Sequence, residues 1–180
     1  MTTLDSIQNT QSLTWWLTGL SGAGKTTLAE ALASHLRSRG FAVCILDGDE
    51  LRKGLSKDLG FSFADREEQS RRAAELARLL NANGILTIVS LVSPSAQGRA
   101  VARQIIGHGN FIESYVSTPL HVCQQRDPKG LYAKAKLDPA LQMTGVSAPY
   151  EAPVAAECII DTNQTELATA IRQLTTFLKV

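Results

Sequence analysis

A glycine-rich segment near the N-terminus constrains the fold of this chain more than any other feature. Residues 19–26 (GLSGAGKT) match the phosphate-binding pattern GxxxxGK[ST], the Walker A motif, in full. The apolar run 13–18 before it is typical of a strand, and 25–39 after it carries apolar residues at helical spacing. A strand, a glycine loop and a helix in this order predict a loop whose backbone N–H groups and helix dipole bind the phosphates of a nucleoside triphosphate. In such a loop Lys25 reaches the outer phosphates, and the Thr26 hydroxyl is suited to Mg²⁺.

Apolar runs alternate with amphipathic stretches along the rest of the chain. Further strands are expected over 42–46, 85–92, 111–116 and 158–160, and helices over 65–82, 96–106 and 164–178. One more helix is expected to begin with Pro119 at its first position, capped by Ser117 or Thr118. This alternation predicts an α/β fold with three layers, a mostly parallel five-stranded sheet with helices on both faces, as in P-loop nucleoside triphosphate hydrolases. The run 85–92 is so apolar that we expect a strand buried on both faces.

Length and composition narrow the class of protein. The chain has 180 residues and a net charge of +1, which fits a single P-loop domain over 13–180 after a segment 1–12 that is expected to be flexible. The near-neutral charge gives no support for nucleic-acid binding. The sequence lacks a signal peptide and an apolar run long enough for a membrane span, so we expect a cytoplasmic protein. The three cysteines are widely separated and are expected to be small buried side chains, and Trp15 and Trp16 are expected in the core.

Two acidic residues follow the second predicted strand, in the segment Asp47-Gly48-Asp49-Glu50-Leu51-Arg52. They should lie at the carboxyl edge of the sheet, where doubly wound folds bind ligands. One acid can orient Mg²⁺ and the other can accept a proton from an attacking hydroxyl, while Arg52 can bind an anionic group. The alternative is a solvated turn that caps a helix. The guanine-reading sequence NKxD of GTPases is absent. These features favour a phosphotransferase that acts on a small molecule.

Further basic residues suggest sites for anions. Arg66 lies in the first turn of a predicted helix, where acidic residues are usual, and could bind a phosphate or sulfate. Arg126 and Lys129 lie where a crossover helix should end, and the irregular stretch 127–153 is expected to form a lid. A basic lid residue that closes over ATP can stabilise the transferring phosphoryl group. The alternative for Arg126 and Lys129 is an ordinary basic helix terminus.

Taken together, these segments resemble the adenylylsulfate kinase family. The residues that carry the resemblance are 19–27 (GLSGAGKTT), 46–52 (LDGDELR), 54–66 (GLSKDLGFSFADR), Ser93-Pro94, 111–113 (FIE), 126–132 (RDPKGLY) and 144–153 (TGVSAPYEAP). The implied reaction transfers the γ-phosphate of ATP to the 3′-hydroxyl of adenosine 5′-phosphosulfate (APS), giving 3′-phosphoadenosine 5′-phosphosulfate, a step of sulfate assimilation. The resemblance also implies Mg²⁺ as cofactor with ATP, and a homodimer.

The resemblance assigns roles residue by residue. Lys25, Asp47, Asp49 and Ser93 are the expected catalytic residues, and Thr26 and Asp47 the expected metal site. ATP is expected to bind Gly19, Leu20, Ser21, Gly22, Ala23, Gly24, Lys25, Thr26, Thr27, Arg126 and Lys129. The acceptor is expected to bind Asp49, Arg52, Phe61, Arg66, Gln69, Val92, Ser93 and Met143, with Phe61 stacked on its adenine. Ser93 takes the place of the family's assigned phosphoserine. Since no base neighbours it in sequence, we expect it to hydrogen-bond the acceptor instead.

Four departures from the family pattern lie on the acceptor side. Gln69 stands where the family has Asn, Met143 where it has Phe, and Leu91-Val92 where it has Phe-Ile. After Ser93-Pro94 the family has Tyr and then basic residues, whereas this chain has Ser95-Ala96-Gln97-Gly98-Arg99. Transfer from ATP is therefore better supported than the identity of the acceptor. One alternative is a related P-loop kinase for another modified nucleotide, such as a nucleoside phosphoramidate. Another is a non-catalytic nucleotide-binding regulatory protein.

Overall fold

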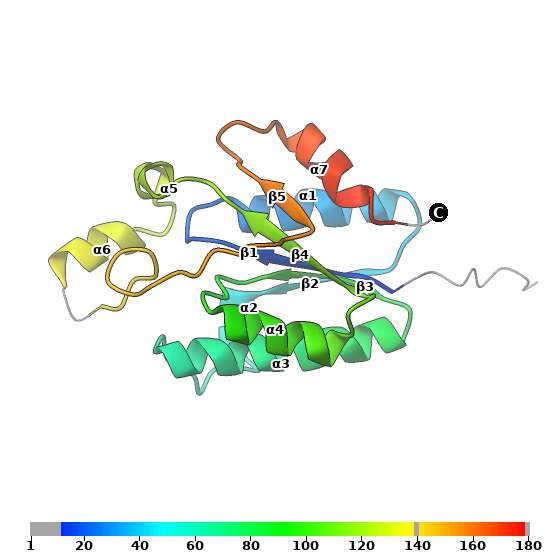
Figure 1. The fold of residues 1–180 in the computed structure, drawn as a ribbon, viewed down its shortest axis with the longest axis horizontal. Coiled ribbons are helices and arrows are strands. Elements are labelled where there is room, and N and C mark those ends of the chain that lie inside the picture. Colours follow the sequence, from blue (N-terminus) through cyan, green and yellow to red (C-terminus); the bar gives the residue numbers. More distant parts are fainter. Residues whose placement is uncertain (1–11, 139–140, 179–180) are drawn as a thin grey trace, which may run out of the picture.

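The computed structural model describes residues 12–138 and 141–178, and within them a parallel sheet of five strands lies between two layers of helices. The strands are β1 (Thr14–Thr18), β2 (Val43–Asp47), β3 (Leu86–Ser90), β4 (Phe111–Val116) and β5 (Cys158–Ile160). The helices are α1 (Lys25–Ser38), α2 (Gly48–Lys53), α3 (Phe63–Ala82), α4 (Ala96–Ile106), α5 (Leu120–Arg126), α6 (Leu131–Leu137) and α7 (Leu167–Thr175). Figure 1 shows α1 and α7 on one face of the sheet and α3 and α4 on the other. The predicted three-layer α/β fold is confirmed.

The strand order β2-β3-β1-β4-β5 places β1 in the middle of the sheet. Each residue of β1 and of β3 is buried, as the apolar run 85–92 predicted, although β3 ends at Ser90. Successive side chains of β1 point to opposite faces. Trp15 therefore packs under α1 and α7 and donates from Nε1 to the Leu174 carbonyl at 2.8 Å. Trp16 packs under α3 and α4 and stacks on Phe111, with ring centroids 5.5 Å apart. The tryptophan prediction is confirmed.

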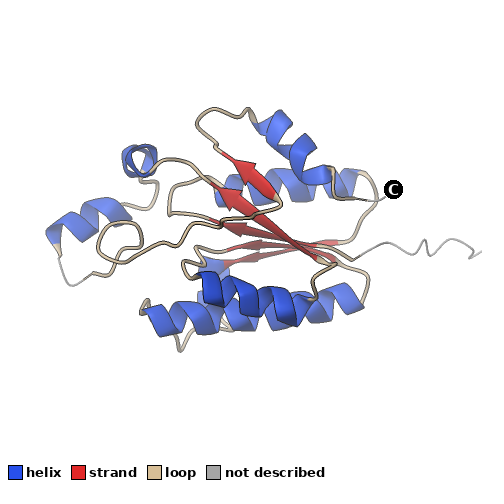
Figure 2. Cartoon of the chain, viewed as in Figure 1, coloured by secondary structure: helices blue, strands red, loops and turns tan. Residues whose placement is uncertain are grey.

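Because all the strands run parallel, their carboxyl ends meet at one edge of the sheet, and the loops that follow them lie close together (Figure 2). The glycine loop follows β1, α2 follows β2, and the turn 91–95 follows β3. Residues separated by about 70 positions in sequence are thereby brought to one place. Among the described residues, no helix combines the length and the apolar character that a membrane crossing requires.

Several predicted limits need correction. Helix α3 begins at Phe63, not Asp65, because Ser62 and Asp65 form a capping box in which each side chain accepts from the other's backbone N–H. Helix α7 covers Leu167–Thr175 and is shorter than 164–178, since residues 164–165 form a turn whose N–H groups donate to the Asp161 carbonyl.

The predictions for Pro119, for the lid and for one cysteine also need correction. Pro119 is the N-cap residue of α5 and not its first helical residue, and the Thr118 hydroxyl bonds to the Ala23 carbonyl instead of capping. The stretch 127–153 is not irregular throughout, because α6 lies within it. Cys123 and Cys158 are buried as expected, whereas Cys44 is only partly buried. The predicted flexible segment 1–12 lies, apart from Ser12, outside the described residues.

Candidate active site

A cavity of about 1240 Å³ opens at the carboxyl edge of the sheet. Most of the residues predicted for the site line it: Ser21, Gly22, Gly24, Lys25, Thr26, Thr27, Asp47, Asp49, Arg52, Phe61, Arg66, Gln69, Val92, Ser93, Arg126, Lys129 and Met143. The other three predicted residues of the glycine loop, Gly19, Leu20 and Ala23, do not line the cavity, and Ala23 is fully buried. The structure thus brings the predicted donor side, acid pair and acceptor side to one cavity.

The glycine loop takes the conformation that an anion site requires. Gly24 is the N-cap residue of α1 and has a φ of +100°, in the left-handed region. Gly22 has a φ of +75°, and a Cβ there would lie 2.9 Å from the Cys123 carbonyl oxygen. A residue with a side chain would therefore strain the loop and push it away from α5. The loop ends on the positive end of the α1 dipole, where phosphate binds favourably.

Lys25 lies at the start of α1 with its ammonium group over the loop. Its Nζ donates to the Gly19 carbonyl at 2.9 Å and to the Leu20 carbonyl at 2.8 Å. Burial lowers the pKa of Lys25 to about 8, and repulsion from Lys129 acts in the same direction. A buried ammonium with a lowered pKa is a strong partner for an anion, because a bound phosphate provides the stabilising negative charge that replaces the lost solvation.

The lowered pKa predicts that ATP affinity depends on pH. A bound triphosphate raises the pKa of Lys25 again, so below pH 8 the ammonium is charged with or without nucleotide and affinity is constant. Above pH 8 binding must take up a proton, and the Kd for Mg-ATP should rise by up to about tenfold per pH unit. Titration calorimetry between pH 7 and 9.5 measures this. In Lys25→Met the dependence should disappear, and a flat profile in the unmodified protein would contradict the assignment.

The two acids lie at the end of β2 and the start of α2. Asp47 is the N-cap of α2: its Oδ1 accepts from the Asp49 N–H at 2.9 Å, and its Oδ2 accepts from the Thr26 hydroxyl at 3.1 Å. The alternative of a helix-capping turn is therefore correct for Asp47, but its second oxygen still faces the glycine loop. The Thr26 hydroxyl and the Asp47 carboxylate are hard oxygen donors of the kind that Mg²⁺ prefers, so the residues present fit this ion.

Residues of the predicted lid and of the end of α5 lie near the acid pair and the glycine loop. Lys129 forms an ion pair with Asp49, so it lies beside the acid expected to receive the proton. Helix α6 is joined to the loop through Tyr132, whose hydroxyl donates to the Ser21 carbonyl at 2.9 Å. Arg126, at the end of α5, donates to the Thr162 hydroxyl at 2.7 Å and thereby lines the donor side of the cavity. Arg126 and Lys129 therefore both reach the cavity.

The acceptor side is a cluster of arginines around one exposed ring. The Cζ of Arg52 lies 4.5 Å from the centroid of the Phe61 ring, and that of Arg66 lies 5.6 Å from it. Phe61 is 55% exposed, so part of its ring remains available for stacking. Burial lowers the pKa of both arginines, and for Arg66 the charge of Arg52 adds to the effect. Two partly desolvated guanidinium groups so close together create a strong site for an anion.

Gln69 takes part in this cluster from the buried face of α3. Its side-chain oxygen accepts from Arg52, and its amide nitrogen donates to the Gly48 carbonyl at 2.8 Å. Gln69 therefore links Arg52 to the turn that carries Asp47 and Asp49. Met143 is 6% exposed and lies in the cavity wall, where its thioether can cover one face of a ring.

Ser93 occupies the turn after β3 and has a φ of +43°, which is unusual for a residue with a side chain. Its Oγ accepts a hydrogen bond from the Trp16 indole Nε1 at 3.0 Å. Val92, beside it, accepts at its carbonyl from the Thr18 hydroxyl at 2.8 Å. Ser95 is the N-cap of α4, because its hydroxyl oxygen accepts from the Gly98 N–H at 2.8 Å.

Sequence reasoning missed several residues that shape the site. Arg99 bonds to the Ser93 carbonyl, Tyr150 bonds to the Thr18 hydroxyl beside that turn, and Thr162 packs against the glycine loop. The sequence did offer one signal for Arg99: it is a charged residue on the same helical stripe as the buried Ala102. The Thr144 hydroxyl is buried in the cavity wall without a hydrogen-bond partner among the described residues, and nothing in the sequence pattern could have indicated that.

Comparison with known proteins decides the family. A sequence model described as adenylylsulphate kinase matches residues 11–161. The chain belongs to the adenylylsulfate kinase family. Members of this family are ATP-dependent kinases that phosphorylate an alcohol group, so this chain is a kinase of that class. A curated adenylyl-sulfate kinase of Shewanella amazonensis is 50% identical over 163 residues, which is 91% of this chain and 82% of that protein.

Solved structures agree with this family. The APS kinase of Mycobacterium tuberculosis in complex with AMPPNP and APS superposes with a TM-score of 0.88 at 38% identity, covering 93% of this adenylylsulfate kinase and 98% of that chain. The hexameric APS kinase from Thiobacillus denitrificans has a TM-score of 0.69 at 32% identity, over 93% of this chain and 29% of that one. The resemblance inferred from the motifs is therefore confirmed.

Proposed function

We propose that this kinase transfers the γ-phosphate of ATP to the 3′-hydroxyl of APS. A bond forms between the 3′ oxygen and the γ phosphorus, the bond from that phosphorus to the β–γ bridging oxygen breaks, and the hydroxyl proton passes to the Asp49 carboxylate. ADP and 3′-phosphoadenosine 5′-phosphosulfate are the products. One observation carries the proposal: a single cavity joins the glycine loop, the acid pair and the Arg52–Phe61–Arg66 cluster.

Each side of the cavity then has a role. The glycine loop and Lys25 bind the triphosphate, and Arg126 at the end of α5 and Lys129 in the predicted lid lie over it. Thr26 and Asp47 would hold Mg²⁺, which supplies positive charge to the phosphate oxygens when bound. Phe61 and Met143 cover the adenine of the acceptor, and Arg52 and Arg66 bind its phosphosulfate group. Gln69 keeps Arg52 in place through the hydrogen bond described above.

Ser93 acts in this proposal as a hydrogen-bond donor to the acceptor, without a phosphoserine intermediate. The Trp16 indole donates to its Oγ, and no group among the described residues accepts the hydroxyl proton as a base would. Ser93→Ala should therefore keep turnover, with kcat reduced by about tenfold or less, the value of one neutral hydrogen bond. Steady-state assays measure kcat. Loss of all turnover, together with ³²P retained on the unmodified protein after incubation with labelled ATP, would contradict this role.

The test of the reaction is direct. Purified protein with ATP, Mg²⁺ and APS should give a product phosphorylated at the 3′ position, identified by phosphorus NMR and mass spectrometry. A panel of other nucleotides, including a nucleoside phosphoramidate, is assayed in parallel, because the acceptor-side departures at Gln69, Leu91, Ser95 and Met143 leave that class open. Preference for another acceptor would overturn the choice of APS. ATP binding without any turnover would favour a regulatory protein instead.

We also infer that the kinase is cytoplasmic and homodimeric and acts without nucleic acid or membrane. The first inference is supported by the family assignment and by thiols that are all free among the described residues. The homodimer is an expectation from the family resemblance. Size-exclusion chromatography with light scattering measures it, and a monomer at the assay concentration would refute it.

A further inference from the structure

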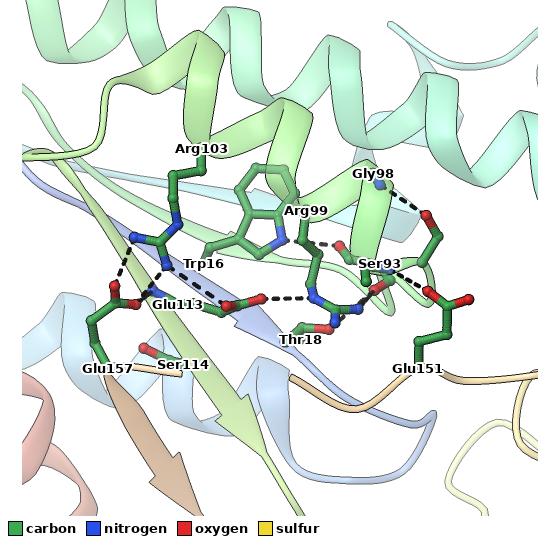
Figure 3. Close-up of polar contacts among 12 residues, drawn as sticks. Trp16, Thr18, Ser93, Gly98, Arg99, Arg103, Glu113, Ser114, Glu151 and Glu157 are labelled. Atoms are coloured by element: carbon green, nitrogen blue, oxygen red, sulfur yellow. Dashed lines mark hydrogen bonds and ion pairs between the residues drawn. The ribbon is translucent and has the colours of Figure 1, made fainter. Parts of the chain in front are cut away.

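We propose that Arg99 is a positioning residue that sets the affinity for the acceptor without touching it. It does so by holding the main chain of Ser93 in its left-handed conformation. This inference rests on the proposed function, because it takes Ser93 to face the acceptor. Figure 3 shows the contacts that carry it, around the turn between β3 and α4.

The Ser93 backbone needs an external restraint. Its φ of +43° lies in the region that glycine adopts readily and that other residues adopt only at a cost. Such conformations persist where the surroundings hold them, and they cluster at functional sites. Ser93 is 4% exposed and lines the cavity, so the restraint acts where a ligand would bind.

Three side chains supply that restraint. Arg99 Nη1 donates to the Ser93 carbonyl at 2.8 Å. The Thr18 hydroxyl, whose one proton goes to the Val92 carbonyl at 2.8 Å, lies 3.3 Å from the same Ser93 oxygen. The Trp16 indole N–H, which can only donate, bonds to Ser93 Oγ. The Trp16 bond thus takes one acceptor site of the Ser93 hydroxyl, and the hydroxyl proton remains available to a ligand. Of the three, Arg99 alone brings a charge, and charge-assisted hydrogen bonds are the stronger ones.

Arg99 is itself held rigidly. It is 4% exposed, and its Nε donates to Glu113 Oε1 at 2.7 Å. Glu113 in turn lies next to Arg103, which forms two hydrogen bonds with Glu157 at 2.7 and 2.8 Å (Figure 3). One end of the guanidinium is thus anchored to β4 through Glu113, and the other end holds the turn. This planar fork with two separate partners is a geometry that lysine cannot reproduce.

The same turn is joined to the end of the predicted lid. The Glu151 N–H donates to the Pro94 carbonyl at 2.8 Å, and the Glu151 carboxylate accepts from the Ala96 N–H at 2.6 Å. The Tyr150 hydroxyl bonds to that of Thr18 at 2.9 Å, and the Tyr150 ring lies 6.0 Å from Arg99 Cζ. A displacement of Arg99 would therefore shift the acceptor turn. The glycine loop touches that turn through the Gly19 N–H, which donates to the Val92 carbonyl at 3.4 Å, but Lys25, Tyr132 and Thr162 hold the loop independently of Arg99.

Arg99→Lys tests the proposal, with Arg103→Lys as the matched control. Both arginines lie on α4 and pair with Glu113, but no contact of Arg103 with the Ser93 turn is seen among the described residues. We expect Arg99→Lys to raise the KM for APS by about tenfold or more, as small displacements of positioning groups do. The KM for ATP should stay within about twofold in both variants, and so should the KM for APS in Arg103→Lys.

A glycine background separates positioning from simple stabilisation. Glycine takes a positive φ without help, so in Ser93→Gly the addition of Arg99→Lys should change the Kd for APS by less than about twofold. Calorimetry gives this Kd even where turnover is low. Should Arg99→Lys fail to fold, Arg99→Met with Glu113→Gln removes both charges together and should raise the Kd for APS in the same way.

Three results would overturn the proposal: an unchanged APS affinity in a folded Arg99 variant, an equal effect of Arg103→Lys, or an equal effect in the Ser93→Gly background. Failure of the proposed function would give a different result: the unmodified protein would bind ATP but would neither bind nor phosphorylate APS. The role proposed for Arg99 would then be wrong as well.

Discussion

Replacing Lys25 with alanine is expected to lower kcat by about 10³-fold or more, which leaves no turnover in an ordinary assay. The ammonium group lies buried over the glycine loop, held by two loop carbonyls. In the proposed reaction this is where charge develops on the transferring phosphoryl group. Water cannot replace it well, because the site is desolvated. Steady-state kinetics with ATP, Mg²⁺ and APS measure the loss.

The matched control is Lys57→Ala. Lys57 is an exposed lysine in the turn after α2, away from the cavity, and its loss should change kcat by less than about twofold. Circular dichroism checks that both variants are folded. Retention of more than a tenth of the activity in Lys25→Ala would show that the loop backbone alone supports catalysis.

The fold could be predicted from the sequence because each element has a local signal. The apolar run 85–92 indicated a strand buried on both faces, and the alternation of strands and helices gave the parallel sheet. The predicted helix ends were wrong where a side chain forms a hydrogen bond with a backbone group outside the regular helical pattern. Ser62 and Asp65 begin α3 two residues early, and Thr118 bonds to Ala23 across the sheet edge. Periodicity carries no information about such contacts.

The site was predictable where its residues follow one another in sequence. The glycine loop and the pair Asp47 and Asp49 have fixed spacing, so a motif finds them. The residues that hydrogen-bond to Ser93 do not follow one another in sequence and were not predicted. Arg99 and Trp16 reach it from another helix and another strand, and Trp16 had been assigned to the core alone. A side chain that is both a core residue and a hydrogen-bond donor to the site has no sequence pattern of its own.

The ion pair between Lys129 and Asp49 connects the lid to the acid that the proposed reaction uses. Both side chains are about half exposed, at 53% and 56%. Exposed pairs of this kind contribute about 1 kcal/mol or less, which corresponds to about fivefold in a rate. If Asp49 served only to hold the lid, its removal would therefore have a small effect. If it receives the proton of the attacking hydroxyl, the effect must be much larger, and the two roles can be separated by magnitude.

Asp49→Asn should lower kcat by about 10²- to 10⁴-fold, the usual contribution of a general base, while the Kd for ATP stays within about threefold. Asparagine keeps the shape of the side chain but cannot take the proton. The control is Asp58→Asn, the same neutralisation at a carboxylate that is also 56% exposed, pairs with Arg72 and does not line the cavity. Its kcat should remain within about twofold. A loss in Asp49→Asn of only about fivefold, equal to that of Lys129→Met, would assign Asp49 to lid closure and leave the proton to another acceptor.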